Sequence, residues 1–126
     1  MRYSKVIYRD FLQPNAEVLL GVIVQDDNGI TTKFDLTPLR FEQVKNISPK
    51  ADWDTFRLFD VTFKKGFLDK GAIITSDHNG KKKLTIKDPS FLEYLHEKFQ
   101  NNYQIEKPEE IDNPNKIVDL LVSFGS

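Results

Sequence analysis

The sequence predicts an α+β domain in which an antiparallel sheet, built from two hairpins and an N-terminal strand, packs against three or four helices. The main observation is a turn signal that occurs twice: apolar runs lead into Asn28-Gly29 and into Asn79-Gly80. Asn-Gly tolerates the positive φ angles of a type I′ turn, so each block predicts a pair of strands. A second observation, a row of phenylalanines at helical spacing between the blocks, predicts helices that pack on this sheet.

The N-terminal third reads as three strands. Ser4 to Arg9 is rich in apolar residues and predicts the first strand, and a turn is expected at residues 13–15 because they contain proline and asparagine. Residues 17–25 form an almost continuous apolar run, typical of a buried central strand. Gly21 inside this run predicts a bulge or a close backbone approach. Residues 30–34 follow as the paired strand.

Two helices are expected next. Thr37-Pro38 combines a capping hydroxyl with a proline at the first helical position, and it predicts a helix over residues 39–46. Asp52 or Asp54 caps the following helix, and Gly71 ends it. Four phenylalanines share one face of that helix: Phe56, Phe59, Phe63 and Phe67. We interpret this row as core, and an apolar binding groove is the alternative.

The second hairpin is expected over residues 72–75 and 83–87, and Asp88-Pro89 begins another helix, which ends near residues 101–102. Its apolar face consists of Phe91, Leu92, Leu95 and Phe99. We expect residues 1–103 to form a single α+β domain. Residues 104–126 are expected to be a polar linker followed by an apolar segment, residues 116–124, that packs on the same domain. Its Asn-Pro start favours a helix, but its Ile and Val content also allows a strand.

The composition places limits on the class of protein. The chain has 126 residues, ten of them Phe, and no cysteine, which excludes a disulfide framework, thiolate metal sites and a cysteine nucleophile. No apolar run approaches the roughly 18 residues that cross a bilayer, and the N-terminus lacks a secretory signal. We therefore expect a cytoplasmic protein without membrane contact.

Charge is distributed unevenly along the chain. Residues 64–87 carry seven lysines against two aspartates, whereas residues 88–126 carry three lysines against eight acids. The preferred interpretation is that the two parts neutralise each other and that lysines guard a strand edge. The alternative is a nucleic-acid surface made of Lys64, Lys65, Lys81, Lys82 and Lys83.

No catalytic signature stands out. The two histidines, His78 and His96, lie in a predicted turn and on a polar helix face, and neither belongs to a metal-binding motif. The acids before Gly29 do not alternate as a calcium loop requires, and the single glycines form no phosphate-binding loop. We expect no catalytic residue, no metal and no cofactor.

Three segments resemble a family of small uncharacterised bacterial proteins, a domain of unknown function. That family opens with a Tyr-Ser-led strand, here Tyr3-Ser4-Lys5-Val6-Ile7-Tyr8, and continues with a Gly-Val-Ile/Val-Val strand, here residues 21–24. Its closing helix looks similar to residues 91–103. The resemblance implies a bacterial or phage origin and a small accessory protein. It implies no catalytic residue, because the family has no assigned activity.

These observations favour a non-enzymatic interaction or regulatory protein that binds a protein partner. The first alternative is a nucleic-acid-binding protein that uses the basic hairpin Lys81–Lys83. The second is an enzyme with an unrecognised site. Self-association into a homo-oligomer is left open.

Overall fold

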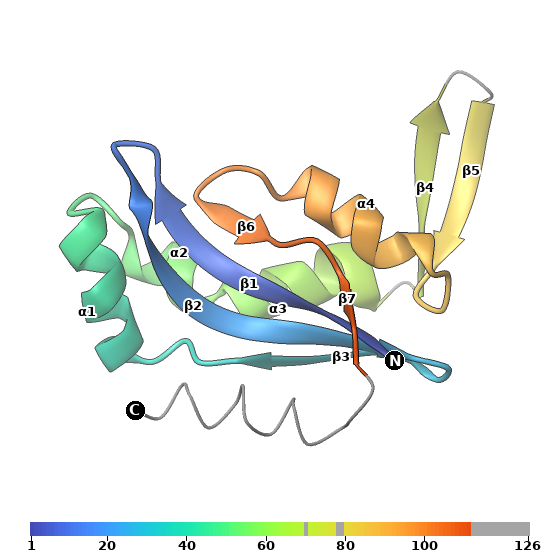
Figure 1. Cartoon of the computed structure of the whole chain (residues 1–126), viewed down its shortest axis with the longest axis horizontal. Helices are drawn as coiled ribbons and strands as arrows, with labels where there is room; N and C mark the ends of the chain where they lie inside the picture. The colour runs from blue at the N-terminus through green and yellow to red at the C-terminus, as the bar shows by residue number, and fades with distance from the viewer. Residues whose placement is uncertain (70, 78–79, 112–126) are drawn as a thin grey trace.

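The computed structural model describes residues 1–69, 71–77 and 80–111, and it confirms the α+β class (Figure 1). The strands are β1 (Arg2–Asp10), β2 (Gln13–Asp26), β3 (Gly29–Phe34), β4 (Ala72–Asp77), β5 (Gly80–Thr85), β6 (Tyr103–Ile105) and β7 (Glu109–Glu110). The helices are α1 (Pro38–Ile47), α2 (Trp53–Arg57), α3 (Phe59–Phe63), the π-helix η1 (Lys64–Leu68) and α4 (Ser90–Lys98).

Five of the described strands form the main antiparallel sheet, in the order β3-β2-β1-β6, with β7 also paired to β1. The predicted irregularity at Gly21 is confirmed. Val6 pairs with Gly21 and Ile7 pairs with Leu19, so Leu20 is an extra residue in β2. A Cβ atom on Gly21 would lie 2.2 Å from the carbonyl oxygen of Lys33. Only glycine allows β3 to approach this closely.

The turn between β1 and β2 differs from the expectation. It consists of Phe11 and Leu12, whereas the predicted turn residues 13–15 belong to β2. The side chain of Asp10 accepts a hydrogen bond of 2.8 Å from the backbone N–H of Leu12, which forms the turn without glycine or asparagine. Pro14 instead lies where the ladder is interrupted, between the pairs Asp10–Gln13 and Arg9–Glu17. Proline has no backbone N–H to donate, and at this position in the sheet no ladder hydrogen bond is lost.

Both predicted Asn-Gly hairpins are present, as β2–β3 and β4–β5, but the predicted type I′ turn is wrong for the first. Type I′ requires positive φ at both central residues, and no described residue other than glycine has positive φ. Gly29 closes the turn with φ 130°, and Asp26 Oδ1 accepts from the N–H of Asn28 at 2.8 Å. Asp at the first position and Gly at the fourth are typical of a type I turn.

The second hairpin stands apart from the main sheet. Within the described residues β4 and β5 pair only with each other, and Figure 1 shows them extending away from the rest of the molecule beyond α4. At the base of the hairpin the N–H of Ile86 donates to the carbonyl of Gly71, which continues the pairing of the two strands by one residue on each side. The side-chain amide of Gln25 holds the following turn by donating to the carbonyls of Ile86 and Asp88.

The predicted caps of the first two helices are confirmed, whereas α4 begins one residue later than predicted, with Pro89 at its N-cap position. Thr37 caps α1 by accepting from the N–H of Arg40, and Asp52 caps α2 by accepting from the N–H of Thr55. Asp88 accepts from the N–H of Ser90 at 2.9 Å at the start of α4. The expected second helix is divided, because Leu58 (φ −93°, ψ 1°) separates α2 from α3.

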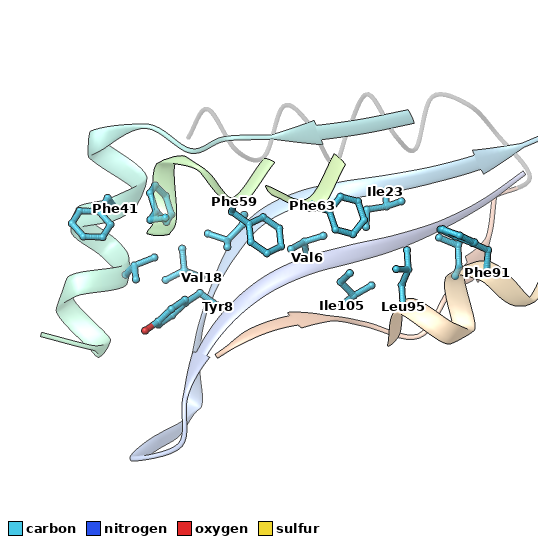
Figure 2. Packing of buried hydrophobic residues seen from close by; sticks show 14 of the residues in the cluster. Val6, Tyr8, Val18, Ile23, Phe41, Phe59, Phe63, Phe91, Leu95 and Ile105 are labelled. Atoms are coloured by element: carbon cyan, nitrogen blue, oxygen red, sulfur yellow. The ribbon is translucent and has the colours of Figure 1, made fainter. Parts of the chain in front are cut away.

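The phenylalanine row is core, as predicted, for three of its four members. Phe56, Phe59 and Phe63 are at most 8% exposed, whereas Phe67 is half-buried. Figure 2 shows the cluster running from Phe41 at one end, past Phe59 and Phe63 in the middle, to Phe91 at the other end. The helices therefore cover one face of the sheet with a continuous apolar layer.

The prediction of a polar linker after residue 103 is wrong for the first part of that segment. Residues 103–105 and 109–110 form β6 and β7, which pair with β1, Val6 lying opposite Ile105 and Tyr3 opposite Glu109. Ile105 is 1% exposed. A short polar stretch can form a strand when a neighbouring strand supplies its hydrogen bonds. The expected apolar segment at residues 116–124 lies outside the described residues.

Candidate functional site

A groove with a volume of about 340 Å³ lies between the phenylalanine row and the end of α4. We call it the aromatic groove. Its lining consists of Phe59, Phe67, Lys98, Phe99, Asn101 and Tyr103. This volume lies within the usual range of small-molecule sites.

The rings of the groove fix one another. Phe59 stacks on Tyr103 with centroids 4.9 Å apart and an interplanar angle of 9°. Phe67 meets Phe99 edge to face at 5.2 Å, and Phe63, beneath them, contacts both. Offset-stacked and edge-to-face pairs are the favoured arrangements of aromatic side chains. The groove is therefore a preformed surface.

The π-helix η1 shapes one wall. The N–H of Asp69 donates to the carbonyl of Lys64 at 2.8 Å, the wider hydrogen bond that defines this helix type. Phe67 lies on this wider turn and is only half-buried, although it continues the row of Phe59 and Phe63. Single π-turns are rare and occur frequently at functional sites.

Polar groups are few in the groove. Burial, with smaller contributions from Tyr8 and Asp52, raises the pKa of Tyr103 to about 12, so its phenol is neutral at physiological pH. Lys98 and Asn101 are exposed at the rim. Lys98 makes no ion pair with any residue that the structure describes. The groove thus combines an apolar floor with one positive charge.

The basic hairpin presents a second surface. Lys81, Lys82 and Lys83 are all exposed, as predicted. Ile74 pairs with Lys83, so the two side chains share a face of the hairpin, and Lys81 lies two residues further along the same face. Ile74 is 71% exposed. Lys82 lies on the opposite face, in a hollow lined also by Glu93 and Glu97 of α4.

The remaining predicted lysines lie elsewhere. Lys64 forms an ion pair with Asp60 at 3.2 Å and lines a hollow with Thr31 and Ile86. Lys65 is exposed on the π-helix. The five lysines are therefore spread over the π-helix and two faces of the hairpin, and the acids of α4 flank one of those faces.

The histidine on α4 has a structural contact. His96 Nδ1 lies 2.7 Å from the carbonyl oxygen of Ile105, which fixes the proton on Nδ1 and joins α4 to β6. Among residues 1–69, 71–77 and 80–111, no three His, Cys, Asp or Glu side chains are grouped to hold a metal ion. His78, the other candidate, lies outside the described residues.

The sequence offers the phenylalanine row as an alternative groove but does not indicate the residues that complete it. Its pattern predicts Phe99 on the core face of a helix and Tyr103 at the end of the domain. Lys98 and Asn101 carried no signal, because a lysine and an asparagine at a helix end are typical of a solvated terminus. The packing of Phe99 on the phenylalanine row, together with the pairing of β6 with β1, brings these residues beside Phe59 and Phe67.

Comparison of the chain with known protein families, with curated proteins and with solved structures gave no match. The resemblance to a bacterial family therefore stays a prediction. None of the helices in the described part of the chain is both long enough and apolar enough to span a membrane.

Proposed function

We propose that this chain is a small non-enzymatic interaction protein that binds a protein partner through the β4–β5 hairpin. The observation that carries the proposal is an isoleucine, Ile74, that is 71% exposed on a two-stranded sheet standing apart from the body. What distinguishes Ile74 from other exposed apolar side chains is its position on β4, which within the described residues pairs on one side only. A cytoplasmic location and a bacterial or phage origin belong to the same proposal.

The mode of binding that fits this hairpin is addition of a strand. Within the described residues β4 has no neighbour on its outer edge, so its backbone groups there are free to pair. The sequence of β4, Ala-Ile-Ile-Thr-Ser-Asp, carries no lysine, whereas β5 carries three. Lysine opposes edge pairing, so β4 is the permissive edge. An extended segment of a partner would add to β4 and contact Ile74.

Charge defines the partner further. Lys81 and Lys83 share the face that carries Ile74. A partner segment with an apolar residue opposite Ile74 and acidic residues beside it complements this face. We therefore propose an acidic, extended segment of another protein as the occupant.

The proposal is tested with a matched pair of variants in the full chain. Ile74 on β4 and Leu39 on α1 are 71% and 70% exposed, so Ile74→Ser and Leu39→Ser remove equal exposed apolar surfaces at different sites. Each protein is immobilised, and partners from the native cell are quantified by mass spectrometry. We expect a stoichiometric partner that Ile74→Ser loses and Leu39→Ser retains. A partner that both variants retain, or no partner at all, contradicts the proposal.

A second function, nucleic-acid binding, is favoured by one observation: the three consecutive lysines of β5 are all exposed. Basic hairpins follow phosphates, and each contact adds roughly 0.7–0.9 to the salt dependence of binding. Gel shifts of wild type and the triple variant Lys81→Ser, Lys82→Ser, Lys83→Ser measure this. Salt-sensitive binding lost in the triple variant would replace the protein-partner proposal. The edge-guarding interpretation instead expects no gel shift and more self-association of the variant in light scattering.

A further inference from the structure

We propose that the aromatic groove binds a small carboxylate with an apolar body. This inference goes beyond the protein interaction proposed above and concerns a different surface. The hairpin carries that interaction, whereas the groove is formed by α3, η1, α4 and the chain that enters β6.

The floor of the groove selects an apolar body. Four of its six lining residues are aromatic, and they hold one another through stacked and edge-to-face contacts. An apolar group placed there covers the exposed parts of Phe67 and Phe99, both only half-buried in the chain alone. Because the rings are already fixed, binding costs little ordering of the protein.

The wall made by η1 gives independent support. An ordinary α-turn after Phe63 would carry residue 67 along the same buried face. The wider turn, closed by the bond between Asp69 and Lys64, coincides with a phenyl ring that is left partly exposed at the groove. Irregular helical turns of this kind recur at binding and catalytic sites.

The rim selects the charge of the ligand. Aromatic surfaces attract cations as well as neutral molecules, so the rings alone would also accept an amine. Lys98 at the rim disfavours a cation and attracts a carboxylate, and the amide of Asn101 beside it can donate a hydrogen bond.

The charge of Asp52 contributes to the raised pKa of Tyr103 in the groove. Its carboxylate caps α2, with Oδ2 accepting 2.8 Å hydrogen bonds from both the N–H and the hydroxyl of Thr55. These hydrogen bonds lower the pKa of Asp52, and the bond from the backbone N–H of Thr55 makes the largest contribution. Its charge is thus directed to the start of the helix, and Lys98 is the charged residue that lines the groove.

The test uses the full chain and three probes with the same apolar body: phenylbutyrate, phenylbutanol and phenylbutylamine. Binding is followed by NMR with labelled phenylalanine rings. We expect saturable shifts of the Phe59, Phe67 and Phe99 rings, with Phe91, fully buried and outside the groove, as the unchanged reference. Phenylbutyrate should bind about fivefold more tightly than phenylbutanol, the size of one exposed charge interaction. Phenylbutylamine should bind most weakly.

Two variants test whether Lys98 causes the preference for a carboxylate. Lys98→Gln should bring the affinity for phenylbutyrate down to that for phenylbutanol and leave the alcohol unchanged. Lys65→Gln, an exposed lysine on η1 that does not line the groove, should change neither. Tighter binding of the amine, a carboxylate preference that survives Lys98→Gln, or an absence of shifts in the groove rings overturns the inference. None of these results affects the hairpin proposal, which depends on Ile74.

Discussion

The main sheet and the β4–β5 hairpin are both antiparallel, but they are stabilised in different ways. In the main sheet, Val6, Leu20 and Ile23 are completely buried beneath the helices. In the hairpin, Leu84 is buried near the base, whereas Ile74 and the three lysines of β5 face solvent. The free energy of folding is therefore concentrated in the body, and the hairpin offers backbone edges and side chains to a partner. Four experiments test this difference between the body and the hairpin.

The largest effect is expected from the aromatic core of the body. Phe63 is 2% exposed and contacts Phe34, Phe59, Phe67 and Phe99. Phe63→Ala should lower the free energy of unfolding by about 3–5 kcal/mol, because it removes apolar burial and leaves a cavity. Chemical denaturation measures the change.

The half-buried Phe67 provides the control for that experiment, since it lies in the same row. Phe67→Ala should cost clearly less than Phe63→Ala. Equal losses would mean that Phe67 is part of the closed core and that the groove is not an open surface.

The two turn glycines give a matched comparison between the regions. Gly29 closes the β2–β3 turn with φ 130°, and Gly80 follows the β4–β5 turn with φ 106°. A valine is strained at either position, at a cost of about 1–3 kcal/mol. At Gly29 an added Cβ also lies 2.9 Å from Ile86 Cδ1, whereas at Gly80 it meets no atom within 4 Å.

Gly29→Val should therefore destabilise the whole protein more than Gly80→Val, whose strain is relieved when the hairpin alone opens. Thermal unfolding of the two variants beside wild type measures the difference. A larger loss for Gly80→Val would show that the hairpin is integral to the folding of the body.

A smaller effect is expected at alkaline pH, and it reports on the body, because residues 72–85 contain no tyrosine. Burial raises the pKa of Tyr103 from 10.0 to about 12, and a hydrogen bond to Glu109 raises the pKa of Tyr3 to about 12. The unfolded chain releases these protons first, so the free energy of unfolding should fall as the pH rises from about 10 to about 12. Below about pH 10 both phenols are protonated in the folded and the unfolded state, so they add no pH dependence to the free energy of unfolding.

Absorbance titration of the phenols and denaturation at several pH values measure this dependence. Tyr103→Phe should remove one late-titrating phenol and reduce the alkaline loss of stability. An unchanged titration curve in that variant would contradict the assignment to Tyr103.

Much of this fold could be predicted because its signals are local. Thr37 and Asp52 are the caps that the sequence predicts, since a side chain that accepts a hydrogen bond from the next turn is specified within a few residues. The hairpins followed from Gly29 and Gly80 in the same way. The type of the first turn was missed because Asn-Gly also fits a turn in which only the glycine has positive φ.

The parts that could not be predicted depend on pairing between distant residues. β6 and β7 are short and polar, and they are strands because β1 supplies their hydrogen bonds across about a hundred residues of chain. The same pairing brings Tyr103 beside Phe59, and so it completes the groove. No local pattern at Lys98 or Asn101 indicates that arrangement.

The central claim is that the body is the stable unit, whereas the hairpin opens locally and is free to pair with a partner. Native-state hydrogen exchange of the full chain tests this claim most directly. The amides of β1 and β2 should exchange only through global unfolding. The amides of β4 and β5 should exchange through a local opening that costs at least about 2 kcal/mol less. Equal protection of the two sets would contradict the account, because it would show that the hairpin and the body open as one cooperative unit.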